Sequence, residues 1–315
     1  MVDLREVFDT EHSGLDTFLG LPKCDDLSQL DAAVAIIGAP VATPYPGFGL
    51  FSATAPDAIR QAFIYDAPVI SHHDFDIGGS ILDEEYGKIV DAGDLPTSET
   101  DFAHNRALIA NAVGQILDAG AKPLVIGGDD SIPIPVFQAF AGRDKYTILQ
   151  IDAHIDWRDE VRGERFGLSS TMRRASEMEG LEQIIQVGMR SAGSARTAEY
   201  HDALAWGAKI ITAQQVYRQG VTEVIDFIPA DSNVLVTFDC DALDSGIMPA
   251  VMSPTPGGLM YWDVVELLQG VAKKANLCGF NLVEFMPDRD TNGTAGLLAA
   301  RIIFNAAALM AKQHT

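Results

Sequence analysis

Residues 146–157 read YTILQIDAHIDW, an apolar run that ends in Asp152, His154 and Asp156. Such a run is typical of a strand covered on both faces of a parallel sheet. Residues 233–244, NVLVTFDCDALD, repeat the arrangement with Asp239 and Asp241. Because the carboxyl ends of parallel strands meet at one edge of a sheet, we expect these polar side chains to lie together there.

The same alternation of apolar runs and helical patterns extends along the chain. Repeated strand-then-helix units predict a doubly wound α/β sheet. No break in composition or low-complexity linker marks a second domain, so we expect a single domain over residues 1–315. The expected strands are 33–40, 88–94, 123–129, 146–154, 183–190, 208–213, 233–241 and 277–285, and the expected helices are 55–63, 99–119, 134–142, 194–206, 261–275 and 295–313.

Composition and charge restrict the class of partner. The chain has 315 residues, 47% of them hydrophobic, and a formal net charge of −22. So negative a protein is expected to bind neither nucleic acid nor an anionic membrane. Three cysteines provide no disulfide framework, and we see no signal-peptide pattern at the N-terminus. We therefore expect a cytoplasmic protein.

A third polar cluster, Gly127–Ser131, follows the apolar run PLVI and contains Asp130. Buried carboxylates are very unfavourable without partners, and few basic residues lie near these clusters in the sequence. In an extended segment residues i and i+2 point to one side, so Asp239 and Asp241 are expected to reach the same ions. Carboxylates with one imidazole suit Mn²⁺, and less strongly Ni²⁺, Co²⁺ or Zn²⁺. The alternative for any single cluster is a turn or capping network.

These motifs, in this order, resemble the ureohydrolase family of arginase and agmatinase. The resemblance rests on GGD-x-S, DAHID and FDCDALD, with NLVEFMP and PYPGFGLFSATAPDAIRQAF beside them, and spans roughly residues 35–310. It implies a three-layer α/β/α sandwich with a mostly parallel sheet. It also implies two divalent metal ions, a trimer or hexamer, and hydrolysis of guanidino compounds to urea and an amine.

The resemblance also implies residue roles. Asp152 and Asp239 would bridge the two ions, and Asp156 would bind the first. His154 and Asp241 would bind the second, and Glu284 would hold the substrate's guanidinium.

Two positions depart from the family pattern. Asp130 stands where the family has a metal-binding histidine. The five carboxylates of the site would then contribute a charge of −5 against +4 from two divalent ions; they are Asp130, Asp152, Asp156, Asp239 and Asp241. This excess of negative charge should favour Mn²⁺ and make the metal-bound water a weaker nucleophile. Leu168 aligns with a histidine that shuttles protons, and leucine has no acid–base chemistry. Trp157, directly after the DAHID motif, is expected either to line the substrate pocket or to pack in the core.

The leading hypothesis is therefore a binuclear metal-dependent amidinohydrolase that acts on a small cationic guanidino substrate. Asp241 would transfer a proton, and Glu284 would orient the substrate. Agmatine, guanidinobutyrate, guanidine and an alkylated biguanide all stay open as substrates. Because two histidines are replaced, the alternative is a catalytically weak or silent subunit that supports an active paralogue, as in heteromeric ureohydrolases of the metformin hydrolase type.

Overall fold

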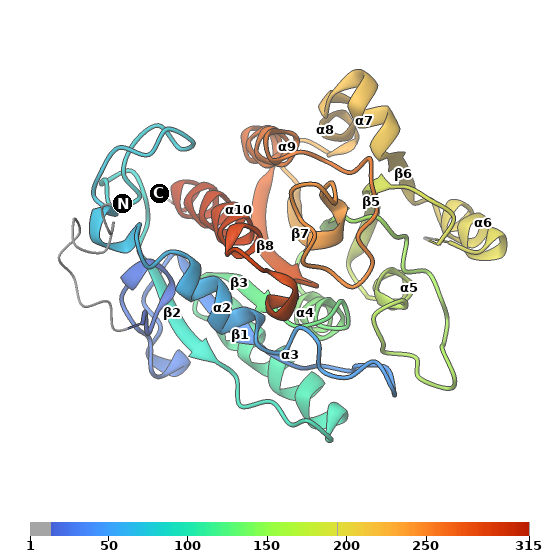
Figure 1. Ribbon diagram of the computed structural model, residues 1–315, viewed down its shortest axis with the longest axis horizontal. Coiled ribbons are helices and arrows are strands. Elements are labelled where there is room, and N and C mark those ends of the chain that lie inside the picture. Colours follow the sequence, from blue (N-terminus) through green and yellow to red (C-terminus); the bar gives the residue numbers. More distant parts are fainter. Residues whose placement is uncertain (1–13, 194, 315) are drawn as a thin grey trace.

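The computed structural model describes residues 14–193 and 195–314 (Figure 1). Eight parallel strands form one sheet in the order β2-β1-β3-β8-β7-β4-β5-β6. All eight expected strands are confirmed. Their bounds are β1 Val34–Ala39, β2 Ile89–Asp94, β3 Lys122–Gly127, β4 Tyr146–Ile151, β5 Leu181–Met189, β6 Lys209–Thr212, β7 Asn233–Asp239 and β8 Asn276–Val283.

The helices follow the strands in alternation, and all six expected helices are present. Three further helices are absent from that set of six: α5 lies between β4 and β5, and α7 and α8 lie between β6 and β7. The bounds are α2 Ala55–Ala62, α3 Phe102–Asp118, α4 Pro133–Phe140, α5 Thr171–Ala175, α6 Thr197–Trp206, α7 Ala213–Gln219, α8 Thr222–Phe227, α9 Tyr261–Lys274 and α10 Thr294–Lys312. Short 3₁₀ helices span Phe18–Gly20, Leu27–Gln29, Ala67–Val69, Cys240–Ala242 and Pro287–Arg289.

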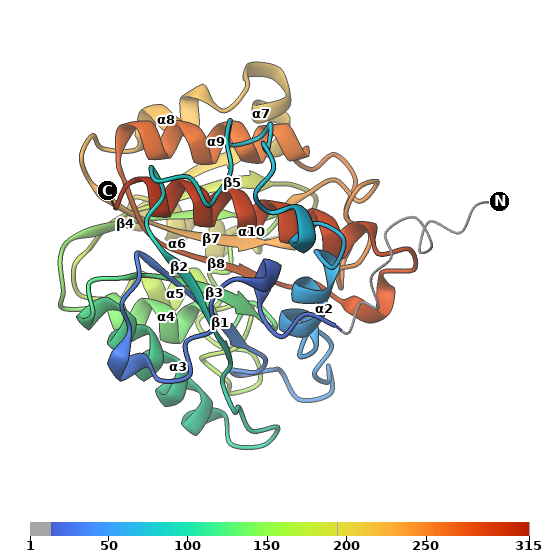
Figure 2. The same cartoon turned by 90° about the vertical axis from the view of Figure 1, so that its left-hand side faces the viewer.

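The sheet lies between two helical layers, each with its own apolar core (Figure 2). Side chains of α2 and α7–α10 pack on one face, and those of α3–α6 pack on the other. The inner strands are buried on both faces because they are largely apolar; β1, β3 and β4 are buried at every position. This arrangement confirms the three-layer α/β/α sandwich.

Helix α10 is long and apolar enough to cross a bilayer by length and composition, but 72% of its apolar window is buried inside the protein. Its side chains, among them Ile302, Ile303 and Met310, belong to the core on its face of the sheet. The hydrophobicity of α10 is therefore accounted for by packing.

All strands except β2 end one to three residues earlier than predicted, and three of these ends bear on the polar clusters. Strand β4 ends at Ile151, β7 at Asp239 and β8 at Val283. In β7 the cause is local: Oδ1 of Asp239 accepts the backbone N–H of Asp241 at 2.7 Å, and this turns the chain into the 3₁₀ helix Cys240–Ala242. The prediction that Asp239 and Asp241 share one side of an extended segment was therefore wrong in its geometry.

Strand order decides which loops meet. Strands β3, β8, β7 and β4 are consecutive neighbours in the sheet. Ile151 of β4 is paired with Phe238 of β7, and Phe238 is paired with Leu282 of β8. Because these pairs are in register at the carboxyl ends, the residues that follow the four strands emerge side by side at one edge.

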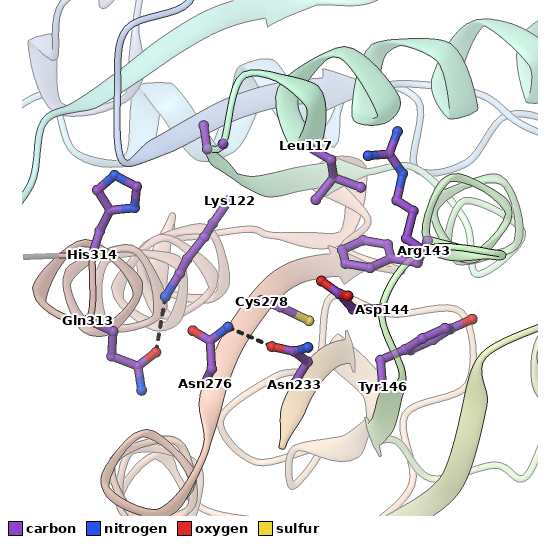
Figure 3. Close-up of a pocket in the computed structure, with 13 residues that line it drawn as sticks. Leu117, Lys122, Arg143, Asp144, Tyr146, Asn233, Asn276, Cys278, Gln313 and His314 are labelled. Carbon is purple, nitrogen blue, oxygen red and sulfur yellow. Dashed lines mark hydrogen bonds between the residues drawn. The ribbon is translucent and has the colours of Figure 1, made fainter. Parts of the chain in front are cut away.

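The opposite edge of the sheet carries a separate cavity of about 450 Å³, where the strands begin (Figure 3). There Lys122 at the start of β3 donates a hydrogen bond to Oε1 of Gln313 at 3.2 Å. The same oxygen accepts the N–H of Leu277, and Nε2 of Gln313 donates to the carbonyls of Ala272 and Ala275. Gln313 thus fixes the end of the chain to the sheet.

Candidate metal centre and substrate cavity

The turn after β3 places Asp130 at the carboxyl edge of the sheet, near the middle of that edge. A side chain at Gly128 would place its Cβ only 2.1 Å from the carbonyl oxygen of Pro40, so the close approach of these two chain segments requires glycine. Asp129 accepts hydrogen bonds from the backbone and the hydroxyl of Ser131. Asp129 therefore shapes the turn, and Asp130 is the acid that faces the neighbouring strands.

Two groups of ligand atoms meet at this edge. Carboxylate oxygens of Asp130, Asp152 and Asp239 lie within 4.8 Å of one another. A second group consists of Asp152, His154 and Asp241, whose ligand atoms also lie within 4.8 Å of one another. In this group Nδ1 of His154 lies 3.0 Å from Oδ2 of Asp241. Asp152 belongs to both groups. The sequence-predicted residues from three strands are thus brought together as two adjoining ligand sets.

Asp156 is held next to Asp152 by a buried glutamine. Nε2 of Gln150 donates to Oδ2 of Asp152 at 2.7 Å and to Oδ2 of Asp156 at 2.8 Å. Gln186 on β5 in turn donates to Oε1 of Gln150 at 2.5 Å and to the carbonyl of Ile155 at 2.9 Å. This pair of glutamines therefore sets the orientation of both carboxylates.

The electrostatics of the site are unfavourable without bound cations. Burial raises the pKa of the acidic side chains well above the usual range of carboxyl groups, and the charges of neighbouring acids raise it further. For Asp130 the charge of Asp156 contributes most after burial. The residues with this strong upward shift of the pKa are Asp130, Asp156, Asp239 and Glu284.

The pKa of His154 is raised for a different reason, because His154 forms ion pairs with two of these acids. Burial alone would lower its pKa, but hydrogen bonds to Asp152 and Asp241 raise the pKa of His154 to about 12. The same contact lowers the pKa of Asp241 against the effect of burial. Within the described residues, none of the five aspartates forms an ion pair with lysine or arginine, and only His154 pairs with two of them.

The ligand set fits divalent metal ions. Oδ2 of Asp130 is buried and has no hydrogen-bond partner in the described part of the chain. A buried carboxylate oxygen without a donor is costly, and a cation would compensate it. Several carboxylates and one imidazole are donors that suit Mn²⁺ and related ions.

A cavity of about 190 Å³ opens beside these ligands. Glu284, which follows β8, contributes one wall; its Oε1 accepts the backbone N–H of Asp130 at 2.9 Å. Trp157 is 3% exposed, lines this cavity and also packs edge-on against Trp206; its contact with substrate stays a prediction. The lining residues are Asp130, His154, Asp156, Trp157, Arg158, Leu168, Ser169, Gly193, Glu199, Asp239, Asp241, Met252, Ser253 and Glu284.

Three residues near the site were missed by sequence reasoning. Gln150 and Gln186 are buried amides inside otherwise apolar strands, and that mismatch was the available signal. The guanidinium of Arg190 donates to the carbonyls of Asp241, Leu243 and Thr255. Arg190 therefore ties the loop after β7 to the loop that carries Ser253, and it contacts main-chain oxygens rather than carboxylates.

Comparison with known proteins identifies the family. The sequence model of the Arginase family matches residues 32–309. The chain belongs to the arginase family. Guanidinobutyrase of Pseudomonas aeruginosa is 27% identical over 301 residues, which cover 92% of this chain and 91% of that protein. Agmatinase of Pyrococcus horikoshii is 30% identical over 278 residues, which cover 87% and 90%.

Solved structures agree with this assignment. Proclavaminate amidino hydrolase from Streptomyces clavuligerus gives a TM-score of 0.79 at 25% identity, over 96% of this chain and 99% of that chain. The agmatine ureohydrolase of Thermoplasma volcanium gives 0.77 at 26% identity, over 98% and 97%. As a member of the arginase family, the chain is a hydrolase of C–N bonds, and the fold expected from the resemblance is confirmed.

Proposed function

We propose that this protein is an amidinohydrolase that releases urea from a small guanidino compound with the help of two divalent ions. The observation that carries the proposal is the pair of ligand sets sharing Asp152, placed beside a cavity whose wall holds Glu284. Relatives named guanidinobutyrase, agmatinase and guanidino acid hydrolase support this class of substrate.

The ions would be held by Asp130, Asp152, His154, Asp156, Asp239 and Asp241. Divalent ions in such a site make water a nucleophile near neutral pH. Mn²⁺ is the ion that the oxygen-rich ligands favour, and Ni²⁺ or Co²⁺ would also be accepted.

The residues of the chain would bind the substrate and move the proton. Oε1 of Glu284 accepts the N–H of Asp130, and in the described residues Oε2 has no hydrogen-bond partner, so it can accept from a guanidinium. The carboxylate of Asp241 lies on the cavity wall and would take the proton of the attacking water and pass it to the leaving amine. Leu168 lines the cavity and contributes only an apolar surface.

The test is to purify the protein alone, load it with Mn²⁺, Ni²⁺ or Co²⁺, and measure metal content and urea release over a panel of guanidino compounds. We expect two ions per chain and turnover of at least one compound, with turnover strongly reduced in Glu284→Gln. Two bound ions with no urea from any compound would contradict the proposal. Activity that returns only on adding a paralogous subunit would instead support the silent-subunit alternative.

A further inference from the structure

The cavity contains one arginine and no lysine among its described lining residues. Arg158 stands in a wall that also includes six carboxylates, four of them proposed metal ligands, together with His154. A cation in such surroundings could serve either to neutralise the acids or to bind an anionic group. The contacts of Arg158 distinguish these two roles.

The backbone of Arg158 is fixed, and its guanidinium is only partly paired. Its N–H donates to the carbonyl of Ser169 at 3.0 Å. Its Nε lies 3.8 Å from Oε1 of Glu199, too far for a hydrogen bond. In the described residues the two terminal nitrogens of Arg158 have no hydrogen-bond partner, and its side chain is 30% exposed.

Glu199 is largely committed elsewhere. Its Oε2 accepts the N–H of Arg196 at 2.9 Å at the start of α6, and its Oε1 lies 3.4 Å from Nη1 of Arg196. The charge of Glu199 is therefore shared between two arginines. The two terminal nitrogens of Arg158 therefore stay available to bind a carboxylate through two parallel hydrogen bonds.

Glu284 and Arg158, the groups that would bind the two ends of the substrate, follow different strands. Glu284 follows β8 and Arg158 follows β4, and β7 lies between them in the sheet. Both side chains line the same cavity of about 190 Å³. A short substrate with a cation at one end and an anion at the other can therefore contact both. Leu168 and Met252 supply apolar wall for methylene groups.

We propose that Arg158 binds the carboxylate of the substrate, and that the preferred substrates are guanidino acids rather than guanidino amines. This inference rests on the proposed function and narrows it. A guanidino amine would bring an ammonium group toward Arg158, where like charges repel. A guanidino acid of similar length would place its carboxylate there and gain a charge-assisted pair.

The experiment compares 4-guanidinobutanoate with agmatine, which carries an ammonium group in place of the carboxylate. Both kcat/KM for urea release and equilibrium binding by calorimetry are measured on the Mn²⁺-loaded protein. The variants are Arg158→Ala and Arg158→Lys, with Arg165→Ala as the matched control, because Arg165 pairs with Asp159 and Glu177 and does not line the cavity. Thermal unfolding confirms that each variant is folded.

We expect the wild type to prefer the acid and Arg158→Ala to lose roughly 10- to 100-fold in kcat/KM and in affinity for it. Agmatine should be unaffected or improved, Arg158→Lys should recover part of the loss, and Arg165→Ala should behave as wild type. A preference for agmatine, or an equal loss on both compounds, would overturn the role of Arg158 while the proposed function stands. If no urea forms from any compound, the proposed function fails, and the binding data still decide whether Arg158 recognises the carboxylate.

Discussion

Two acidic residues of the cavity have positive φ angles, a backbone conformation that residues other than glycine rarely adopt. The φ angles of Asp156 and Glu284 are 44° and 69°. Such conformations cost about 1 kcal/mol or more each and persist only where surrounding contacts fix them. Glu284 N–H donates to the carbonyl of Gly128 at 2.8 Å, and the carbonyl of Asp156 accepts the N–H of Arg173. These contacts keep both carboxylates directed at the cavity at the expense of local backbone strain.

Asp130 is the single position at which the ligand set differs from the pattern that the sequence resembles. We expect Asp130→His to keep or tighten binding of Mn²⁺, because an imidazole replaces one of several mutually repelling acids. Metal content after dialysis and the Kd from competition with a chelator measure this. Asp239→Ala serves as the comparison and should abolish binding of both ions. Unchanged metal affinity together with unchanged stability in Asp130→His would show that Asp130 is not a ligand.

At the scale of elements, the buried glutamines of β4 and β5 link the sheet to the metal ligands. We expect Gln150→Leu to weaken metal binding about 10- to 100-fold, the usual effect of losing a group that orients ligands. Isothermal titration with Mn²⁺ measures the change. Thr237→Val is the matched control, because Thr237 forms a buried hydrogen bond with Asn281 on neighbouring strands and touches none of the acids.

A loss of metal affinity in Thr237→Val as large as that in Gln150→Leu would mean that any buried polar contact in the sheet has this effect. The specific role of Gln150 would then be refuted.

Lys122, at the start of β3, should make the free energy of unfolding depend on pH. Burial lowers the pKa of Lys122 to about 8 in the folded protein, below the ordinary lysine value of 10.5. Between these two pH values the unfolded chain binds more protons than the folded one, so this contribution to stability grows as pH rises and is lost as pH falls through 8. We expect Lys122→Met to be more stable at pH 7 by about 1–2 kcal/mol and to show a flatter rise between pH 8 and 10.

Urea unfolding followed by circular dichroism at several pH values provides the measurement for Lys122→Met. Lys88→Met, at an exposed lysine, is the control and should leave the curve unchanged. Gln313 keeps its bond to Leu277 in the Lys122 variant, so the anchor of the chain end is preserved. An unaltered pH profile in Lys122→Met would contradict the assignment.

For the whole molecule, the acids at the carboxyl edge couple stability to pH and to metal. Their pKa values are raised in the folded state, so above about pH 4 the folded protein binds more protons than the unfolded chain. The metal-free protein should therefore lose stability as pH rises through these raised values toward 8. Mn²⁺ should reverse the loss, by about 2.7 kcal/mol for each site filled at a hundredfold excess over Kd.

Differential scanning calorimetry with chelator and with Mn²⁺, at pH 5 and at pH 8, tests this coupling. The shift of Tm on adding Mn²⁺ should be larger at pH 8 than at pH 5, because more of the acids are ionised. Equal Tm values in all four conditions would contradict both the burial of charge and the metal site.

Much of the architecture could be predicted from the sequence because its causes are local. Apolar runs specify strands buried on both faces, and amphipathic patterns specify the helices between them, so eight strands and six helices were placed correctly. The polar clusters after three strands pointed to one edge of the sheet. Helices α5, α7 and α8 escaped because each is short, and α7 depends on a capping box between Thr212 and Gln215 that has little signal of its own.

The tertiary structure alone decided what surrounds the acids. Strand order placed β3, β8, β7 and β4 side by side, and no local pattern encodes that order. It also brought Gln186, Arg158 and Arg190 to the site, because their partners lie on other strands or in distant loops. The sequence by itself thus determined which residues carry charge and where each strand ends in polar groups. The tertiary structure determined which charges meet, since electrostatic interactions depend on distance in space rather than along the chain.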